Sequence, residues 1–119
     1  MAKTGATGIT RIINAAGYSW LGFKAAFKNE AAFRQELGLT LILAPIALYF
    51  GQSYADKAIL IASLVFILLI EILNSAIEAV VDRHGDEMHE LSGRAKDMGS
   101  AAVLLAFVIA GLVWFAVFI

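Results

Sequence analysis

Acidic and polar side chains form one stripe along an otherwise apolar segment, residues 58–82. On a helix, at 100° per residue, this stripe falls within about 100° of arc. It consists of Glu71, Asn74, Ser75, Glu78 and Asp82. Burying a charge at the centre of a bilayer costs about 2.5–3.5 kcal/mol. Carboxylates in such a segment therefore indicate contact with a cation or a reacting group.

Two kinds of chemistry suit these carboxylates. One can coordinate Mg²⁺, a hard cation that prefers oxygen ligands and arrives with substrate phosphates. Another can accept a proton from a hydroxyl nucleophile. Glu71 lies deeper in the apolar segment than Glu78, so Glu71 is the better candidate for the base. The alternative is a purely structural role for the stripe in hydrogen bonding between helices, for which Asn74 and Ser75 would suffice. Asp82 ends the segment, where water is close, and is the weakest functional candidate.

A charged stretch follows the stripe and then becomes apolar. Lys96 could contact nucleotide phosphates, and Asp97 could orient Lys96 or add negative charge near a helix N-terminus. Gly93 and Gly99 would allow a close approach of the backbone.

Established nucleotide-binding and zinc motifs are missing from the chain. His84 and His89 lack zinc-site spacing, and a solvated loop is the simpler explanation, more so for His84. There is no phosphate-binding G-x-x-x-x-G-K-[ST] loop, no G-x-G-x-x-G loop and no protein-kinase motif set. The residues alone indicate a membrane protein with an interfacial carboxylate site that uses a metal. A proton relay or a small channel subunit fits them about as well.

The composition excludes an ordinary soluble domain. Of 119 residues, 61% are apolar and 16% are charged, whereas soluble domains contain about 25% charged residues. So short a chain cannot hide that much apolar surface from water, so part of it must face lipid. A net charge of −1 argues against a nucleic-acid partner. The absence of cysteine excludes disulfides, thiolate metal sites and cysteine nucleophiles.

Hydropathy and charge predict an all-α integral membrane protein with a single domain and three transmembrane helices. Each apolar segment can cross about 30 Å of hydrocarbon as a helix. The spans are expected at about residues 34–52, 58–82 and 97–119. Basic residues gather before the first span and in the second loop, while the first loop holds only Lys57. The N-terminus and the second loop should therefore be cytoplasmic and the C-terminus outside.

Residues 9–29 predict an N-terminal amphipathic surface helix. Its aromatic-rich apolar face lies opposite a basic polar face, which suits a helix in the plane of the membrane interface. The apolar face consists of Ile9, Ile12, Ile13, Ala16, Trp20, Phe23 and Phe27. The alternative is that this face packs on the spans, and either arrangement keeps Arg11 near the headgroups.

Three stretches together carry a specific resemblance, namely RIINAAGYSWLGFKAAFKNEAAFRQE, EILNSAIEAVVDR and HELSGRAKDMGSAAV. The chain resembles the prokaryotic diacylglycerol kinase family, and most closely the small three-span enzyme of Gram-negative bacteria. The resemblance implies transfer of the γ-phosphoryl group of ATP, with Mg²⁺, to diacylglycerol, giving phosphatidate. It also implies a homotrimer with sites shared between copies, on the cytoplasmic face of the inner membrane, with a periplasmic C-terminus. Two alternatives are a related undecaprenol kinase and an ion or proton conductor that uses the polar stripe.

The resemblance also implies residue roles. Glu71 would be the catalytic base, Asn74 would help to order the site, and Glu30 and Glu78 would bind the metal. The implied nucleotide contacts are Arg11, Tyr18, Glu30, Glu78, Glu87, His89, Lys96 and Asp97. The implied lipid contacts are Arg11, Ala15, Ala16, Gly17, Tyr18, Ser19, Trp20, Glu36, Glu71 and Ser100. If the surface helix extends to residue 30, Glu30 falls beside its apolar face, where it could approach Glu78.

Overall fold

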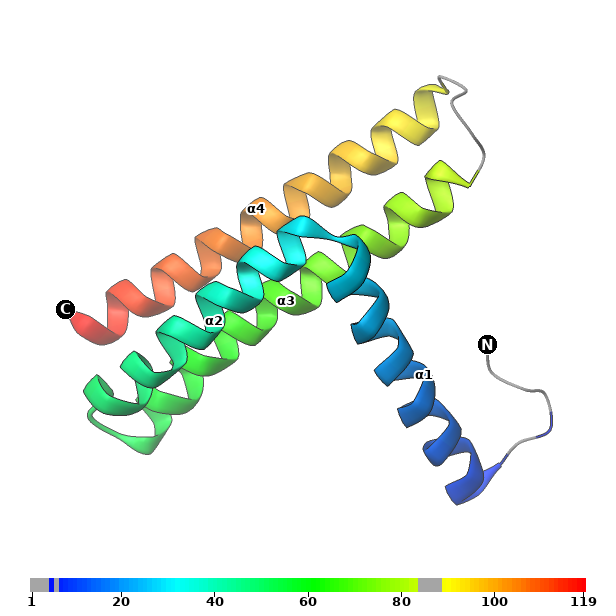
Figure 1. The fold of residues 1–119 in the computed structure, drawn as a ribbon. Coiled ribbons are helices and arrows are strands. Elements are labelled where there is room, and N and C mark those ends of the chain that lie inside the picture. The colour runs from blue at the N-terminus through cyan, green and yellow to red at the C-terminus, as the bar shows by residue number, and fades with distance from the viewer. Residues whose placement is uncertain (1–4, 6, 84–88) are drawn as a thin grey trace.

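The computed structural model of the chain describes residue 5 and residues 7–83 and 89–119, and this part is helical, without a strand. Its helices are α1 (Gly8–Asn29), α2 (Ala31–Phe50), α3 (Tyr54–Asp82) and α4 (Glu90–Phe118) (Figure 1). The all-α prediction is thus confirmed over these residues. Glu87, an expected nucleotide contact, and His84 lie outside them.

Three of the described helices are long and apolar enough to cross a membrane. They are α2, α3 and α4, with 20, 29 and 29 residues. At 1.5 Å per residue, even the shortest reaches about 30 Å, the thickness of the hydrocarbon core. The prediction of three such helices is confirmed by length and composition. Because α4 begins at Glu90, it starts before the apolar segment expected from the sequence.

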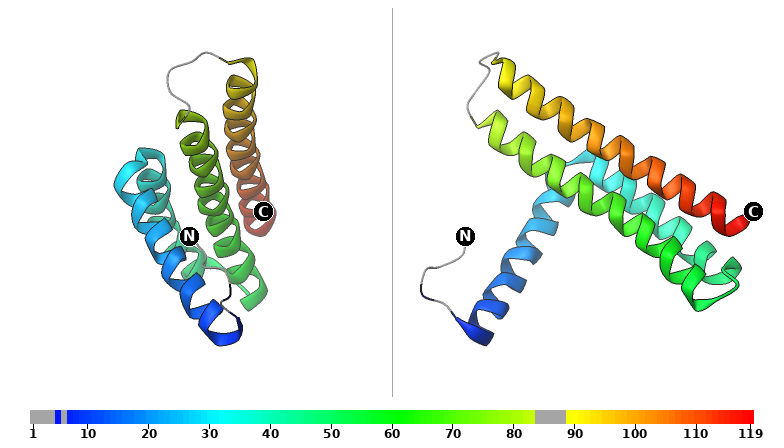
Figure 2. Two further views of the ribbon diagram at one scale, coloured as in Figure 1. Left: turned by 90° about the vertical axis from the view of Figure 1, so that its right-hand side faces the viewer. Right: turned by 180° about the vertical axis from the view of Figure 1, so that it is seen from behind.

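The helix α3 is the centre of a three-helix bundle, with α2 and α4 both packed on it (Figures 1 and 2). The α3–α4 contact buries Ile67 against Ala106 and Ala110, whose small side chains let the two helices come close. Further along this contact the Trp114 ring nitrogen donates a hydrogen bond to Ser63 Oγ at 3.1 Å. Ser63 in turn donates to the Leu60 carbonyl at 2.7 Å, so the polar atoms are satisfied where water is absent.

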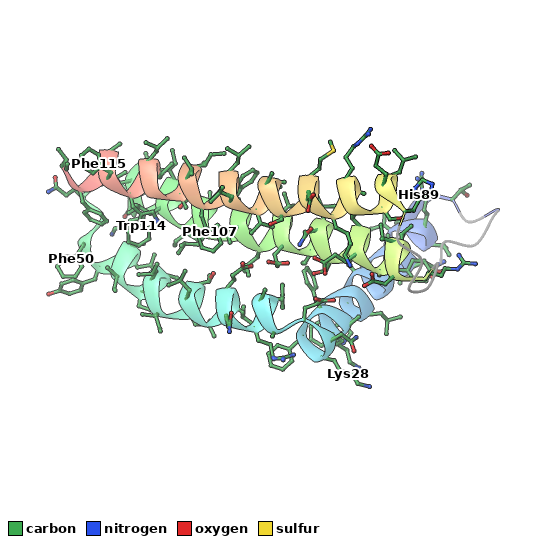
Figure 3. All side chains as sticks on the ribbon, turned by 90° about the horizontal axis from the view of Figure 1, so that it is seen from above. Lys28, Phe50, His89, Phe107, Trp114 and Phe115 are labelled. Atoms are coloured by element: carbon green, nitrogen blue, oxygen red, sulfur yellow. The ribbon has the colours of Figure 1, made fainter. Side chains whose placement is uncertain are left out.

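The two ends of the bundle differ in composition. Phe50, Trp114 and Phe115 gather at one end, whereas His89 lies at the other (Figure 3). Among aromatic residues, Trp and Tyr are enriched at membrane–water interfaces, because each has an apolar ring and a hydrogen-bonding group, and Trp114 is of this kind. The end that carries the polar stripe therefore lies opposite an aromatic end.

The first helix leaves the bundle at a steep angle, and its N-terminus lies far from the other helices (Figures 1 and 2). A single extended residue, Glu30, with φ −117° and ψ 107°, separates α1 from α2. Arg34 in α2 reaches back across this elbow, and its Nη1 donates to the Phe27 carbonyl at 2.7 Å and the Lys28 carbonyl at 3.2 Å. These carbonyls belong to the last turn of α1, where the helix itself offers them no hydrogen-bond donor, so the guanidinium caps the C-terminal end of the helix.

Candidate active site

The polar stripe of α3 points into the molecule at its apolar end and reaches solvent at the other. Glu71 is 4% exposed and Asn74 and Ser75 are also buried, whereas Glu78 is half-buried and Asp82 is exposed. One uninterrupted helix holds all of them, since α3 contains neither proline nor glycine. The carboxylates therefore run from the apolar interior towards water on one face.

A second buried carboxylate lies beside Glu71. Glu36 of α2 is 8% exposed, and its carboxyl group lies close enough to that of Glu71 for the two to interact. Its Oε2 atom is buried without a hydrogen-bond partner among the described residues. Neither carboxyl group forms a salt bridge within this part of the chain. Two acids thus meet in an apolar contact between α2 and α3 without a compensating cation from the described residues.

Side-chain amide and hydroxyl groups hold the carboxylates of α3 in place. Ser75 Oγ donates to Glu71 Oε2 at 3.4 Å, a long hydrogen bond one turn along the helix. Asn74 Nδ2 donates to Glu78 Oε1 at 3.1 Å. Each carboxylate therefore uses one oxygen for a neighbour one turn away, which fixes its orientation.

Lys96 of α4 forms an ion pair with Asp82, at the solvent-exposed end of the polar stripe. Its ammonium lies 3.0 Å from Asp82 Oδ1, so the pair joins the end of α3 to the start of α4. The sequence suggested Asp97 as the partner that orients Lys96, but in the described residues that partner is Asp82. Asp97 also lies two turns into α4 instead of at its start, where Glu90 supplies the acidic first turn.

The remaining α4 residues expected to bind nucleotide line its outer surface. His89 is the N-cap of α4, and its Nδ1 accepts a hydrogen bond from the Leu91 backbone at 3.0 Å. Asp97 and Arg94 line a shallow hollow of about 490 Å³. Ser100, an expected lipid contact, is exposed. The exposed side of α4 thus carries cationic and anionic groups near the polar end of the bundle.

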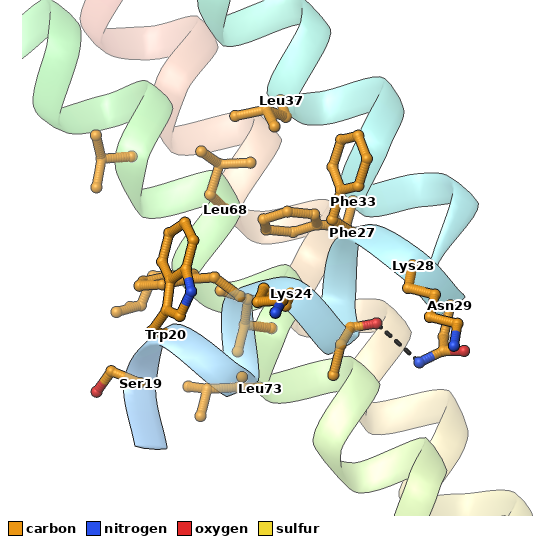
Figure 4. Close-up of a pocket in the computed structure, with 16 residues that line it drawn as sticks. Ser19, Trp20, Lys24, Phe27, Lys28, Asn29, Phe33, Leu37, Leu68 and Leu73 are labelled. Carbon is orange, nitrogen blue, oxygen red and sulfur yellow. Dashed lines mark hydrogen bonds between the residues drawn. The ribbon is translucent and has the colours of Figure 1, made fainter. Parts of the chain in front are cut away.

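A large apolar cavity lies between α1 and α3. Its volume is about 1040 Å³, and Trp20, Phe27 and Leu68 lie along it, with Lys24 and Lys28 among its few polar residues (Figure 4). The walls come from residues 19–29, from α2 and from α3 between Val65 and Leu73. Such a space suits the hydrocarbon part of a lipid, because its lining is apolar and it opens beside the membrane spans.

The structure brings some of the expected lipid contacts to this cavity and leaves others apart. Ser19 and Trp20 line it. Arg11, Ala15, Ala16 and Gly17 are exposed on the part of α1 that stands clear of the bundle, and Tyr18 is half-buried (Figure 1). In all three ribbon views Arg11's end of α1 lies far from the Lys96 end of α4 (Figures 1 and 2). A single chain therefore does not gather all the expected nucleotide contacts.

The expected metal ligands are carboxylates on separate elements. Glu30 lies half-buried at the elbow before α2, and Glu78 lies half-buried on α3. No group of three or more His, Asp or Glu side chains gathers in the described residues. The described residues of one chain therefore do not bring the expected ligands into such a group.

Two features of the site carry no recognisable sequence signal. The cavity wall on α3, including Leu68 and Leu73, is made of apolar residues that look the same as residues facing lipid. The approach of Glu36 to Glu71 depends on how α2 and α3 align, and helical periodicity within each segment does not fix that alignment.

Comparisons with known proteins agree with one another. The sequence profile of the family described as "Prokaryotic diacylglycerol kinase" matches residues 17–118. The chain is 58% identical over 108 residues to the diacylglycerol kinase of Escherichia coli strain K12, covering 91% of this chain and 88% of that protein. It is 51% identical over 114 residues to the diacylglycerol kinase of Haemophilus influenzae, covering 96% and 95%. The diacylglycerol kinase of Pseudomonas aeruginosa is 50% identical over 110 residues, covering 92% and 89%.

Proposed function

The chain belongs to the prokaryotic diacylglycerol kinase family, and from this premise we propose that it transfers the γ-phosphoryl group of ATP to diacylglycerol. The products would be phosphatidate and ADP. The observation that carries this proposal is the buried Glu71 in an apolar helix, at the level where the stripe begins to approach water. An acid there can meet a hydroxyl from the lipid side and phosphate from the aqueous side.

Glu71 acts as the general base in this proposal. Its carboxylate takes the proton of the free hydroxyl of diacylglycerol, and that oxygen forms a bond to the γ-phosphorus of ATP. The bond between the γ-phosphorus and the bridging oxygen breaks, and the electron pair leaves with ADP. The hydrogen bond from Ser75 supports the role of Glu71 because it helps to orient the carboxylate.

Glu30 and Glu78 are the proposed ligands of Mg²⁺. Two carboxylates fit a hard cation that keeps several waters and also binds substrate phosphates. Asn74 occupies Oε1 of Glu78, and Oε2 makes no hydrogen bond to a described residue, so one oxygen faces away from the amide. When bound, the metal would neutralise charge on the phosphates, which is the main electrostatic demand of phosphoryl transfer.

Lys96 and its neighbours are the proposed nucleotide contacts. Lys96 is exposed and paired with Asp82, and an exposed pair of this kind is worth little, so phosphate oxygens can replace the carboxylate. Arg11, Tyr18, His89 and Asp97 complete the described part of the proposed set, and Glu87 belongs to it by resemblance. Polyphosphate recognition through side chains would explain the absence of a glycine-rich phosphate loop.

The cavity between α1 and α3 is the proposed site for the acyl chains. Its apolar lining and its volume of about 1040 Å³ suit part of a two-chain lipid. Ser19 and Trp20 lie on its wall, and Glu36 and Ser100 are further proposed lipid contacts. In this arrangement α1 is an amphipathic helix at the membrane surface, since its large apolar residues Ile12 and Trp20 are 68% and 64% exposed in the single chain.

The proposed setting is the bacterial inner membrane, with the polar end of the bundle in the cytoplasm. The basic residues before α2 and after α3 support this orientation. The C-terminus of α4 would then lie in the periplasm, and residues 1–119 act as one domain. A homotrimer with shared sites is proposed by resemblance to the family, and sharing would bring together the N-terminal part of α1 and the start of α4, which lie far apart in one chain (Figures 1 and 2).

The test is a mixed-micelle assay with γ-phosphate-labelled ATP. The purified full chain should transfer label to diacylglycerol in preference to undecaprenol, and chelation of Mg²⁺ by EDTA should abolish the transfer. Labelled undecaprenyl phosphate in excess of phosphatidate would assign the enzyme to the other lipid. An absence of any labelled lipid, together with ATP-independent ion flux into liposomes, would overturn the proposal.

A further inference from the structure

Gly99 of α4 lies directly against the side chain of Asn74. Gly99 is buried, and a Cβ atom built on it would overlap Asn74 Oδ1 and lie 3.3 Å from Asn74 Cγ. The other two glycines of α4 differ, because a Cβ atom on Gly93 or Gly111 would meet no atom within 4 Å. The missing side chain at residue 99 is therefore space that the Asn74 amide occupies.

The Asn74 amide is hydrogen-bonded through its nitrogen and enclosed at its oxygen. Its Nδ2 donates to Glu78 Oε1 at 3.1 Å, while its Oδ1 is buried and has no hydrogen-bond partner among the described residues. An amide group is planar, so a displacement of the oxygen also turns the NH₂ group. Burying an unpaired oxygen is unfavourable. The Asn74 oxygen nevertheless lies against Gly99, in the space that a Cβ atom at residue 99 would fill.

We propose that Gly99 is a positioning residue, which keeps the Asn74 NH₂ group directed at Glu78 by leaving room for the amide oxygen. The contact links α4 to a proposed metal ligand on α3 through one intervening side chain. This inference rests on the proposed function, because it is there that Glu78 is assigned to Mg²⁺. It adds a residue that touches neither substrate nor metal.

A methyl group at residue 99 would disturb the site more than the fold. The atom it meets is the end of a side chain and not backbone, so rotation of the Asn74 amide relieves the overlap. That rotation breaks the hydrogen bond to Glu78. A glycine needed only for close helix packing would instead respond to alanine with a loss of stability and no specific change at Asn74.

The experiment compares Gly99→Ala with Gly111→Ala in the full chain in detergent micelles. The side-chain NH₂ resonance of Asn74, identified by its absence from Asn74→Ala, should shift in Gly99→Ala and stay in place in Gly111→Ala. The kcat for phosphatidate formation should fall by about tenfold or more in Gly99→Ala, as expected when a hydrogen bond to a charged group is lost. The KM for diacylglycerol should stay within about twofold.

The double variant Gly99→Ala/Asn74→Ala tests the contact even if Gly99→Ala folds poorly. Without the amide there is room for the methyl group, so the Gly99→Ala change should lower resistance to SDS unfolding less on this background. An unshifted Asn74 resonance, a kcat equal to that of Gly111→Ala, or an equal loss of stability on both backgrounds would overturn the inference. If the unaltered chain made no phosphatidate, the proposed function would fail, while the resonance would still report on the contact.

Discussion

At the scale of single residues, the described part of the chain pairs most buried side-chain polar atoms and leaves two unpaired. Ser75 and Asn74 each donate to a carboxylate one turn away. The exceptions are Oδ1 of Asn74 and Oε2 of Glu36, both buried without a partner among the described residues. An unsatisfied buried group in a native protein requires an explanation, and a catalytic role or contact with an ion is one. Both exceptions lie beside the proposed catalytic and metal-binding carboxylates.

The substitution Glu36→Gln should stabilise the fold. Glutamine keeps a hydrogen-bond donor facing Glu71 and removes one of two acids that share an apolar contact. We expect the free energy of unfolding to rise by about 1.5–3 kcal/mol, the usual range for a hydrogen bond to a charged group, since the amide of glutamine donates to Glu71 whether or not that acid is ionised. SDS titration in mixed micelles measures it. The control Glu90→Gln alters an acid whose side chain is 87% exposed and should change stability by less than about 0.5 kcal/mol. A lower stability of Glu36→Gln would contradict the account.

The stripe on α3 could be predicted at this scale, but its partners could not. Helical periodicity alone places Glu71, Asn74 and Glu78 on one face, and the buried positions agree with that. The neighbours of the stripe, Glu36 and Gly99, come from other helices. Their identity depends on the relative shift and rotation of packed helices, which no local pattern within one segment encodes.

At the scale of elements, the elbow between α1 and α2 sets the shape of the apolar cavity. Only Glu30 separates the two helices, and its backbone amide still donates to the Ala26 carbonyl at 2.9 Å. Arg34 adds two hydrogen bonds and a positive charge at the C-terminal end of α1, where the helix dipole favours a cation. The Arg34 guanidinium therefore helps to hold the angle of α1, and with it the cavity wall.

The substitution Arg34→Ala should loosen the end of α1. Loss of the two hydrogen bonds should speed hydrogen exchange at the Glu30 amide by about tenfold, the equivalent of about 1.4 kcal/mol of local stability. Amide exchange followed by NMR measures this rate. Lys28→Ala is the matched control, because it removes a nearby positive charge but keeps the carbonyl that Arg34 binds. Equal exchange rates in both variants would show that Arg34 does not hold the elbow.

The three apolar helices could be predicted because length and hydropathy are local properties of the sequence. The helix ends were harder to predict. The N-terminal part of α4 is charged, so hydropathy alone does not reveal that the helix begins at Glu90, where His89 caps it. The Lys96–Asp82 pair follows from that extension, because it places the two side chains across from each other at the end of the bundle.

At the scale of the whole molecule, one chain is an open structure. It measures 48 × 41 × 21 Å along its principal axes, and α1 projects from the bundle (Figures 1 and 2). The N-terminal part of α1, which holds Arg11, and the start of α4, which holds Lys96, lie far apart in the ribbon views (Figures 1 and 2). Large apolar residues such as Leu41, Leu104 and Leu112 are 67%, 65% and 64% exposed, which leaves extensive surface for lipid or for other copies. Such surface is compatible with the proposed active sites between chains.

Subunit mixing tests that arrangement. Arg11→Ala and Lys96→Ala should each be nearly inactive alone, since each removes a proposed nucleotide contact from every site. If the two residues of a site come from different copies, equal mixing should restore about one quarter of wild-type activity, because that fraction of sites receives both intact residues. The assay is phosphatidate formation after co-reconstitution. Activity that stays at the level of the single variants would place both residues of a site in one chain.

The central claim is that Glu71 accepts the proton of the lipid hydroxyl. Its most direct measurement is the kcat for phosphatidate formation from labelled ATP and diacylglycerol by Glu71→Gln. The control is Asp56→Asn, which alters an acid in the first turn of the same helix. We predict that Glu71→Gln inserts and folds normally but loses at least about 10²-fold in kcat, the lower limit expected when a general base is removed, while Asp56→Asn stays active. Near-normal turnover by a folded Glu71→Gln enzyme would contradict the account.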